Sequence, residues 1–291
     1  MNDRMLKNNQ VAWALVDFLS NSPCAINKRI LEESDPEGNL SEEVLYAAIV
    51  GGLCDFDEND DEIFEKYLLP SIKKLSADEY NSNPYLRDIK FPDGVVSGGW
   101  KFIHDFYKPY EAFIRDDLGI DEEGREIPLI GYFDELFSFP QVQQDGREWM
   151  AVKPSEIESM KEPVEAVKGR VLTFGLGLGY FTYMASIKPD VESVTVIERD
   201  PHAISLFRQY ILPQFKFADK IHIIKEDAFN YLCGMKDGDY DYAFVDLWHD
   251  TSDGLPIYER FKEKEGRFSS TKFIYWVENS LISAMKWKLN A

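Results

Sequence analysis

The sequence predicts an α/β protein built on a parallel sheet with helices on its faces. The main observation is that short apolar runs alternate with helix-like segments between residues 170 and 246, a pattern that requires crossover connections between parallel strands. A second observation is that the run 170–174 leads directly into the glycine-rich segment 175–179. A third is that the next apolar run ends in a carboxylate, Glu198, one strand-helix-strand unit further along.

Composition limits the class of protein and its partners. The 291 residues are 44% hydrophobic and 14% aromatic, which excludes a disordered chain. The 52 acidic and 32 basic residues give a formal charge of −20. Such a charge repels phosphate backbones and anionic lipid surfaces. We therefore expect a small-molecule or protein substrate and neither nucleic acid nor membrane as a partner, and the oligomeric state stays open.

Cysteine content and the N-terminal segment favour a cytoplasmic protein. Cys24, Cys54 and Cys233 follow no disulfide or metal-ligand spacing, which is typical of a reduced intracellular protein. The apolar run 11–16 is interrupted by Asp17 and lacks the basic flank of an export signal. It therefore predicts a short amphipathic helix.

Residues 1–125 are expected to form a mainly helical region. Ser41 is placed to cap one helix, and a helix over 61–69 is expected to end at Pro70. A further helix is predicted over 100–118, because aromatic residues recur there at helical spacings.

An acidic loop, residues 55–62, invites comparison with a calcium-binding loop. Asp60 stands where that loop requires glycine, and Lys66 stands where it requires a bidentate glutamate. The segment is therefore interpreted as a solvated loop that caps a helix. No metal site is predicted elsewhere, because the isolated histidines share no ligand spacing.

Residues 126–168 are expected to form a β-hairpin and a connecting helix. Asp145-Gly146 between two extended runs is a hairpin signal. Ser155 and Glu158 have the spacing of a capping box, which predicts a helix that Gly169 ends. The hairpin is a candidate to occupy a free edge of the parallel sheet.

Residues 169–291 are predicted to form the parallel-sheet domain. The expected strands are 170–174, 193–198, 220–225 and 241–246, and the expected helices are 180–188, 201–212 and 228–235. Asp200-Pro201 supplies an N-cap followed by proline in the first turn, which fixes the start of one helix. The segment beginning at Phe273 is compatible with one helix or with a strand followed by a helix.

The glycine segment favours a nucleoside without a pyrophosphate. The dinucleotide fingerprint requires a third glycine at the position of Tyr180. A ligand without phosphate needs only close approach of the backbone and a carboxylate for its sugar. Glu198 is the predicted ligand of the ribose hydroxyls.

With these features, the segment from Gly169 to Tyr258 resembles the class I S-adenosylmethionine-dependent methyltransferases, with some likeness to the spermidine synthases. The resemblance implies a Rossmann-like sheet, shortened at its C-terminus, and S-adenosylmethionine or its decarboxylated form as cofactor. The cofactor-binding residues that it implies are Gly175, Gly177, Gly179, Glu198, Arg199, Asp227 and Ala228. In this family the glycines lie along the methionine and ribose, Arg199 corresponds to a residue that flanks the adenine, and Asp227 to one that receives its amino group.

The fourth predicted strand ends at Asp246, where the resemblance places the substrate and the reaction. Asp246 and His249 are the candidate catalytic bases, and Trp248 and Asp250 are expected to line the acceptor pocket. The competing interpretation is that Asp246 caps the following helix, Trp248 belongs to the core and His249 is merely exposed, since no partner in the sequence would orient its ring. For Asp246 the functional interpretation is favoured, because ligands of open α/β sheets bind at the carboxyl ends of strands.

We interpret the chain as an enzyme that transfers a methyl group from S-adenosylmethionine to a small molecule or a protein side chain. One alternative is aminopropyl transfer as in the spermidine synthases, which the acid-rich segment 246–253 suggests. Another is a non-catalytic nucleoside-binding or scaffold protein. That alternative is favoured by the few residues after Tyr258, which cannot supply all the remaining strands of a full methyltransferase sheet. A second departure from the family is Thr173, at a position where an acid is common.

Overall fold

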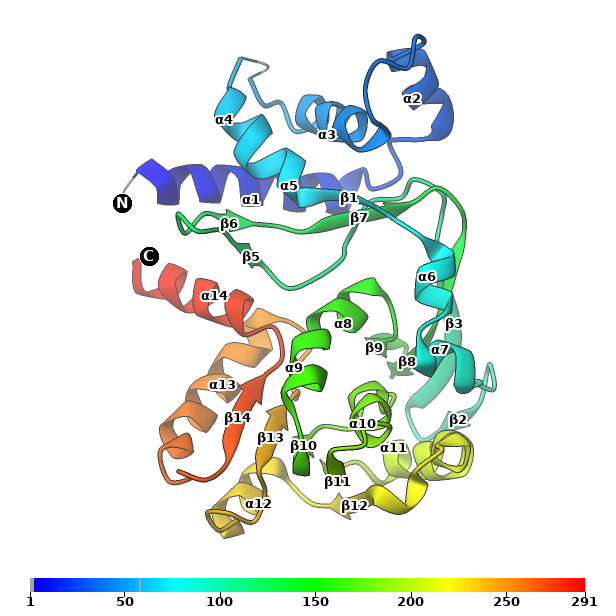
Figure 1. Cartoon of the computed structure of the whole chain (residues 1–291), viewed down its shortest axis with the longest axis vertical. Coiled ribbons are helices and arrows are strands. Elements are labelled where there is room, and N and C mark those ends of the chain that lie inside the picture. The colour runs from blue at the N-terminus through cyan, green and yellow to red at the C-terminus, as the bar shows by residue number, and fades with distance from the viewer. Residues whose placement is uncertain (1–2, 58, 291) are drawn as a thin grey trace. The chain divides into compact units, whose positions relative to one another are not determined.

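A computed structural model describes residues 3–57 and 59–290 of the chain. It divides into two compact units, each made of separate stretches of sequence. Unit 1 comprises residues up to 80 together with 106–138, and unit 2 comprises residues 81–105 together with 139–289. Figure 1 labels the helices and strands of both units.

Unit 2 is built on a five-stranded parallel sheet. Its strands are β10 (Gly169–Phe174), β11 (Val191–Glu198), β12 (Ile221–Lys225), β13 (Tyr242–Val245) and β14 (Lys272–Tyr275). They lie in the order β12-β11-β10-β13-β14, and every neighbouring pair is parallel. The predicted fold class and the first four predicted strands are confirmed. The segment that begins at Lys272 is a strand followed by a helix, which decides between the two readings of that segment.

A helix follows each strand of this sheet, and all but the last of these helices connect successive strands. They are α10 (Tyr180–Ser186), α11 (Pro201–Leu206), α12 (Ala228–Gly234), α13 (Thr251–Glu265) and α14 (Glu278–Asn290); after α11 follow a π-helical turn, η2 (Phe207–Ile211), and two 3₁₀ turns, η3 (Leu212–Gln214) and η4 (Ala218–Lys220). Asp200 caps α11 as predicted, by accepting hydrogen bonds from backbone N–H groups. Asp227 and Asp250 cap α12 and α13 in the same way. Acids that follow the strands therefore fix the starts of the helices.

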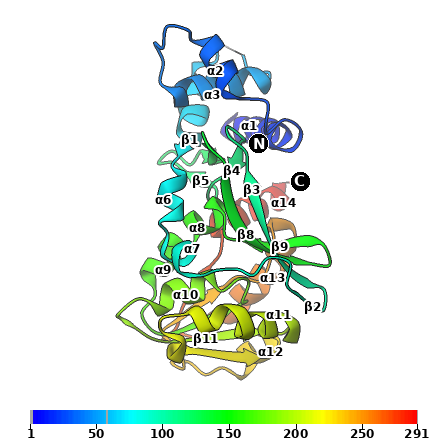
Figure 2. The ribbon, with the colours of Figure 1, turned by 90° about the vertical axis from the view of Figure 1, so that its right-hand side faces the viewer.

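A second sheet contains β2 (Val96–Ser97), β3 (Trp100–Tyr107), β8 (Phe137–Gln144) and β9 (Arg147–Ala151) in that order. Figure 2 shows β3, β8 and β9 side by side. The hairpin turn at Asp145-Gly146 is confirmed, since these residues have positive φ angles of 52° and 81°. The suggestion that the hairpin fills an edge of the parallel sheet is wrong, because β8 and β9 pair within this separate sheet.

The helix predicted over 100–118 is wrong. Trp100 and Phe102 on β3 are buried while Lys101 between them is exposed, which is the two-residue period of a strand. Aromatic side chains suit strands as well as helices. Their spacing therefore did not decide the type of element here.

The connecting segment forms α8 (Pro154–Ser159) and α9 (Lys161–Ala166). The predicted capping box is wrong, because the N-cap of α8 is Lys153, whose side chain makes no capping bond, and a proline opens the helix. Gly169 does not end a helix either. It is the first residue of β10 and has a φ of 66°.

Unit 1 is mainly helical, as predicted, and contains a small sheet. Its elements are α1 (Asp3–Asn21), α2 (Lys28–Ser34), α3 (Glu42–Leu53), α4 (Asp61–Ile63), the π-helical η1 (Phe64–Leu68), α5 (Leu69–Ser71), β1 (Ile72–Leu75), β4 (Phe113–Ile114), β5 (Gly119–Ile120), β6 (Glu126–Ile127) and β7 (Ile130–Phe133). The chain leaves unit 1 through α6 (Ala77–Asn81) and continues in unit 2 with α7 (Pro84–Asp88). Ser41 caps α3 as predicted. The helix end expected at Pro70 is wrong by one residue, because α5 includes Pro70 and ends at Ser71.

Stacked tyrosines join the helices of unit 1 to its sheet. The rings of Tyr46 on α3 and Tyr132 on β7 are 4.0 Å apart at an interplanar angle of 3°. The Tyr46 hydroxyl donates a hydrogen bond of 2.9 Å to the Tyr110 carbonyl oxygen. Burying such rings contributes apolar area while the hydroxyl keeps a partner, so this contact anchors α3 to the sheet β1-β7-β4.

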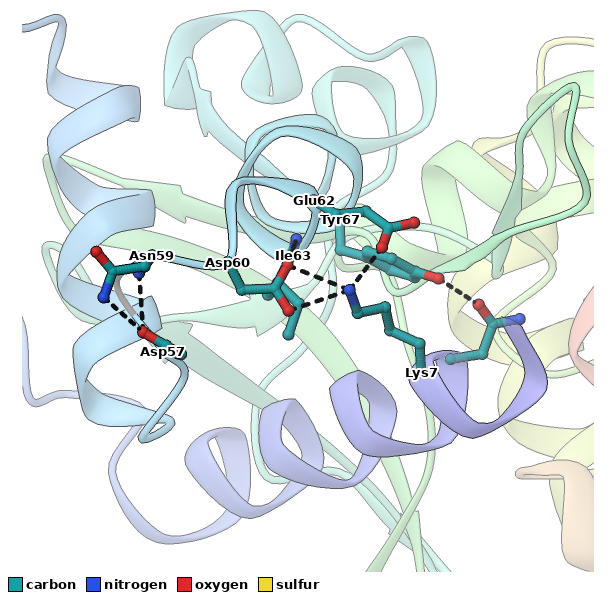
Figure 3. A network of polar contacts seen from close by, with 8 residues as sticks. Lys7, Asp57, Asn59, Asp60, Glu62, Ile63 and Tyr67 are labelled. Atoms are coloured by element: carbon teal, nitrogen blue, oxygen red, sulfur yellow. Dashed lines mark hydrogen bonds and ion pairs between the residues drawn. The ribbon is translucent and has the colours of Figure 1, made fainter. Parts of the chain in front are cut away.

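Acids of the acidic loop in unit 1 pair with the side-chain ammonium group of a lysine in the same unit. Lys7 on α1 forms ion pairs of 3.0 Å with Asp60 and 2.5 Å with Glu62 (Figure 3). The next residue, Asn8, accepts a hydrogen bond of 2.8 Å from the Tyr67 hydroxyl. Asp60 is also the N-cap of α4, so the loop caps a helix and ties it to α1.

None of the helices in residues 3–57 and 59–290 is both long and apolar enough to cross a membrane. Within the same ranges, no group of three or more His, Cys, Asp or Glu side chains is arranged to hold a metal ion. Cys24, Cys54 and Cys233 are free thiols.

Candidate functional site

A cavity of about 150 Å³ lies in unit 2 at the carboxyl ends of the parallel strands. The order of the strands along the chain reverses between β10 and β13, and ligands of open α/β sheets bind at such a point. Six predicted cofactor-binding residues line this cavity: Gly175, Gly177, Glu198, Arg199, Asp227 and Ala228. The predicted acceptor-site residues Asp246 and Trp248 line it as well.

The glycine loop is shaped by the chain's own atoms. Gly175 has a φ of 101°, and a Cβ at this position would collide with the carbonyl oxygen of Asp246. Gly177 has a φ of 50°, and its Cβ position is taken by the sulfur of Met150. Both conformations disfavour a side chain. Glycine is therefore required here for packing, whether or not a ligand also approaches the backbone.

Leu178 has both of its backbone polar groups bound by side chains. Its N–H donates to the Met150 sulfur over 3.1 Å, and its carbonyl oxygen accepts from the Tyr85 hydroxyl. Gly179 follows and is the N-cap of α10. It packs against the Phe207 ring and does not line the cavity. The loop is thus held by β9 and α7, and its first three residues are the part that faces the cavity.

Glu198 lies at the end of β11 with its carboxylate close to the glycine loop. It accepts hydrogen bonds of 2.8 Å from the Asp200 N–H and 3.3 Å from the Leu176 N–H. Burial raises the pKa of the Glu198 carboxyl, and the backbone N–H groups oppose this rise. The two bonds orient the carboxylate and leave it further acceptor capacity for a ligand hydroxyl.

Asp227 and Ala228 follow β12 on the same side of the sheet as Glu198. The Oδ1 atom of Asp227 accepts hydrogen bonds of 3.0 and 3.1 Å from the N–H groups of Phe229 and Asn230. Asp227 therefore has a capping role that is independent of any ligand. Its place in the lining leaves it available to a ligand as well.

Two acids from different elements meet at the other side of the cavity. Asp246 follows β13, and burial raises the pKa of its carboxyl to about 7. Glu156 on α8 is only 7% exposed. Burial, followed by the negative charge of Asp246, raises the pKa of Glu156 well above its ordinary value. Asp246, which the sequence predicted, thus has in Glu156 a neighbour that the sequence did not predict.

Three tryptophans line the cavity beside these acids: Trp149, Trp248 and Trp276. Trp248 is buried, and its indole N–H has no hydrogen-bond partner among the described residues. Its ring packs against Gly254 of α13, where a Cβ would lie 2.7 Å from the ring. The core interpretation of Trp248 is therefore correct for its ring, and the indole N–H stays available.

His249 and Asp250 are not part of the cavity lining. Asp250 is exposed and caps α13. The Nδ1 atom of His249 lies 3.2 Å from the Asp253 carboxylate, and its ring contacts Trp149 with centroids 4.2 Å apart. The expectation that His249 lacks an orienting partner is wrong. Asp253, in the first turn of α13, turns its carboxylate back toward the residues before the helix, where it also accepts hydrogen bonds from the backbone N–H groups of His249 and Asp250.

Sequence reasoning missed lining residues of two kinds, those that come from a helix or the hairpin and those that directly follow a strand. Glu156 lay within the supposed capping box, and Met150 lay within the hairpin. No local pattern distinguished Glu156, because polar Ser155 precedes it and a second acid, Glu158, follows two residues later. No local pattern identifies Trp276, because the type of its segment was itself ambiguous.

The strand order, the glycine loop after the first strand and the acid after the second define unit 2 as a Rossmann-like α/β fold. No protein-family model and no curated protein matches the chain. Similar solved structures include spermidine synthase from Thermotoga maritima, with 17% identity over 47% of this chain and 48% of that chain and a TM-score of 0.34. A spermidine synthase in complex with the transition-state analogue AdoDATO has 19% identity over 47% and 50% and a TM-score of 0.38.

A third similar structure is precorrin 8W decarboxylase from Methanobacterium thermoautotrophicum, with 24% identity over 38% of this chain and 56% of that chain and a TM-score of 0.30. The chain spans about half the length of these three solved structures. Two of the three are spermidine synthases, one of the families that the sequence resembles. Matches of this size concern part of the fold and carry no conclusion about activity.

Proposed function

We propose that unit 2 binds S-adenosylmethionine and transfers its methyl group to a small molecule or a protein side chain. The observation that carries this proposal is the charge of the cavity. Five carboxyl groups line it, those of Glu156, Glu198, Glu226, Asp227 and Asp246, against one cation, Arg199. An acidic, partly enclosed site favours a positively charged ligand, and the sulfonium group of S-adenosylmethionine is such a charge.

The residues of the lining suit the parts of this cofactor. In the proposal, Glu198 accepts hydrogen bonds from the ribose hydroxyls, and the backbone of 175–177 lies along the sugar and the methionine. Asp227 and Arg199 contact the adenine. The unpartnered indole N–H of Trp248 supports a ligand in the cavity, because a buried donor without a partner is costly.

In the proposal, Asp246 acts as the base of the reaction. S-adenosylmethionine, when bound, supplies an activated carbon on a positively charged sulfur. The protein then needs to position the acceptor in line with that carbon and to remove its proton. A carboxyl whose pKa is about 7 is partly ionised near neutral pH and suits this task.

Aminopropyl transfer is a second candidate, and one observation favours it. The N–H of Leu178 in the glycine loop is bound to the Met150 sulfur, so it is not free for a cofactor carboxylate. Arg199 is the one cation in the lining. Decarboxylated S-adenosylmethionine has no carboxylate to be neutralised and would meet less repulsion in this cavity.

Isothermal titration calorimetry with S-adenosylmethionine, S-adenosylhomocysteine and decarboxylated S-adenosylmethionine tests these proposals. Glu198→Ala should weaken binding of all three by about 1–3 kcal/mol, through loss of charge-assisted hydrogen bonds. Glu192→Ala is the matched control, because Glu192 is an exposed acid on the same strand. Failure of all three ligands to bind contradicts both enzyme proposals. Preference for the decarboxylated form contradicts methyl transfer, and binding without turnover indicates a non-catalytic protein.

A further inference from the structure

A second hollow of unit 2 carries the opposite charge to the rest of the molecule. It is an open groove of about 460 Å³ between the helical segment α11–η2 and the last residue of β12, and its lining consists of Pro201, Ile204, Ser205, Arg208, Gln209 and Lys225. Two of these six residues are cations and none is an acid. The groove is therefore a positive site on a chain whose formal charge is −20.

The sequence around the groove is locally basic. Residues 199–225 include five Lys or Arg residues and only two acids, Asp200 and Asp219, whereas acids outnumber cations by 52 to 32 in the whole chain. The Asp200 carboxylate is turned to the start of α11, where it accepts hydrogen bonds from the N–H groups of His202 and Ala203. The reversal of charge is thus a local property of this segment.

Both cations of the groove are free of ion pairs. Among the residues that the structure describes, neither Arg208 nor Lys225 pairs with an acid. The Arg208 guanidinium donates one hydrogen bond of 3.2 Å, to the Ile223 carbonyl oxygen of β12. A guanidinium group has five N–H donors, so this bond fixes its position and leaves other donors unused. Both side chains therefore keep donors for a ligand.

The bond to Ile223 also limits how a partner can bind. Strand β12 is at an edge of the parallel sheet (Figure 1), and an exposed edge is a template for an added strand. Here the Arg208 side chain occupies the Ile223 carbonyl group, so an added strand would have to displace it. A partner is therefore expected to lie in the groove and to make contact through side chains.

We propose that this groove binds an acidic segment of a partner protein. Carboxylate side chains form charge-assisted hydrogen bonds with guanidinium and ammonium groups. Pro201 and Ile204 offer apolar contacts to the aliphatic parts of the same segment. A basic segment would be repelled by the two cations, and a neutral one would leave them without a partner. Because the net negative charge of the chain repels an acidic segment elsewhere, the groove also determines where on the surface the partner binds.

The groove and the cavity are neighbours along the chain but share no lining residue. Lys225 of the groove directly precedes Glu226, which lines the cavity. Arg199 of the cavity lies two residues before Pro201 of the groove. A segment in the groove would thus be held beside the cavity. The inference goes beyond the proposed function and does not depend on it, because binding to the groove is measured without a cofactor.

Fluorescence anisotropy on the full chain tests this inference with three rhodamine-labelled probes: hexaglutamate, hexaglutamine and an oligonucleotide of six thymidines. In 150 mM NaCl the screening length is about 8 Å, so contacts within the groove persist while the charge of the rest of the chain is screened. Hexaglutamate should bind at least about fivefold more tightly than hexaglutamine, as two exposed ion pairs imply. In 1 M NaCl, where the screening length is about 3 Å, this preference should disappear.

Variants of the two cations locate the binding site. Lys225→Gln should weaken hexaglutamate binding about two- to fivefold, and the double variant with Arg208→Gln should weaken it about tenfold. Lys272→Gln is the matched control, because Lys272 is an exposed residue at the start of β14, the opposite edge strand. Its replacement removes the same charge from the same sheet and should leave the affinity unchanged. Thermal unfolding verifies that all variants are folded.

Three results would overturn the inference. The first is equal binding of hexaglutamate and hexaglutamine, or equal losses of affinity in Lys225→Gln and Lys272→Gln. The second is tighter binding of the oligonucleotide, which would show that the groove recognises phosphates. The third comes from sedimentation velocity of the unlabelled chain. Self-association that Lys225→Gln abolishes and Lys272→Gln leaves intact would assign the groove to the acidic surface of a second copy.

Discussion

Asp246 links the chemistry of the cavity to the stability of unit 2. Burial raises the folded-state pKa of its carboxyl to about 7, well above the ordinary value of 3.8, so the folded protein holds this proton more tightly than the unfolded chain does. The resulting stabilisation is complete below the unfolded pKa and is lost as the pH rises through about 7. The same raised pKa that suits Asp246 to accept a proton near neutral pH therefore lowers the stability of the folded protein at that pH.

Asp246→Asn should remove this pH dependence. We expect the variant to be more stable than the wild type at pH 8, by on the order of 2–4 kcal/mol, and to lose this advantage at pH 4. Urea unfolding at both pH values measures the difference. Asp241→Asn is the control of opposite sign, because the Arg170 N–H bonded to Asp241 at 2.7 Å lowers the pKa of its carboxyl. Equal stability of wild type and Asp246→Asn at both pH values would contradict the assignment.

Individual residues at the strand ends were predictable, and their neighbours in space were not. Glu198 and Asp246 follow apolar runs directly, so the rule for parallel strands was sufficient to place them at one edge of the sheet. Glu156, Met150 and Trp276 reach the same cavity from a helix, a hairpin and a fifth strand. Their positions depend on tertiary packing, which no pattern within a short stretch of sequence encodes.

At the scale of elements, the glycine loop is rigid because it is packed from several directions. Met150 from β9 and the Tyr85 hydroxyl from α7 bind the two backbone groups of Leu178. Asn83 donates a hydrogen bond of 3.0 Å to the Tyr180 hydroxyl, and Tyr183 donates one of 2.7 Å to Asp88. These bonds join α7 to α10, so the loop between β10 and α10 is fixed at both sides.

Alanine substitutions should separate the roles of two glycines in this loop. Gly177→Ala should cost about 1–2 kcal/mol, because its φ is positive but the Met150 side chain in its way is able to shift. Gly175→Ala should cost about 3 kcal/mol or more, since its Cβ meets the backbone oxygen of Asp246. Denaturant unfolding measures both, with Gly234→Ala as the control because its Cβ meets no other atom within 4 Å. A larger cost at Gly177 would contradict this packing.

The elements themselves were predicted unevenly, for a physical reason. Strands β10, β11 and β13 each contain an apolar run buried within a parallel sheet, a strong local signal. Strand β3 has a weaker signal, because only Trp100 and Phe102 at its start are buried. Its aromatic residues therefore matched a helical spacing by chance. The hairpin turn was readable because Asp145 and Gly146 suit the positive φ angles that it requires.

At the scale of the whole molecule, a formal charge of −20 acts against the compact state. Raising the salt concentration from 10 to 150 mM shortens the screening length from about 30 Å to about 8 Å. We expect the melting temperature at pH 7.5 to rise by a few degrees over this range. At pH 4.6, near the isoelectric point, the rise should be much smaller. A melting temperature that falls with salt at pH 7.5 would show that local ion pairs such as Lys7–Asp60 outweigh the overall repulsion.

The chain passes between its two units after residues 80, 105 and 138. Each unit is therefore assembled from separated stretches of sequence. A ribosome releases the last piece of unit 1 well before β14 and Trp276, which complete the cavity in unit 2. Unit 1 can thus finish folding during synthesis. Residues 81–105 of unit 2, in contrast, can complete their packing only after residues 139–289 have been made. A genetic crossover that exchanges one continuous segment therefore cannot replace either unit alone and entire.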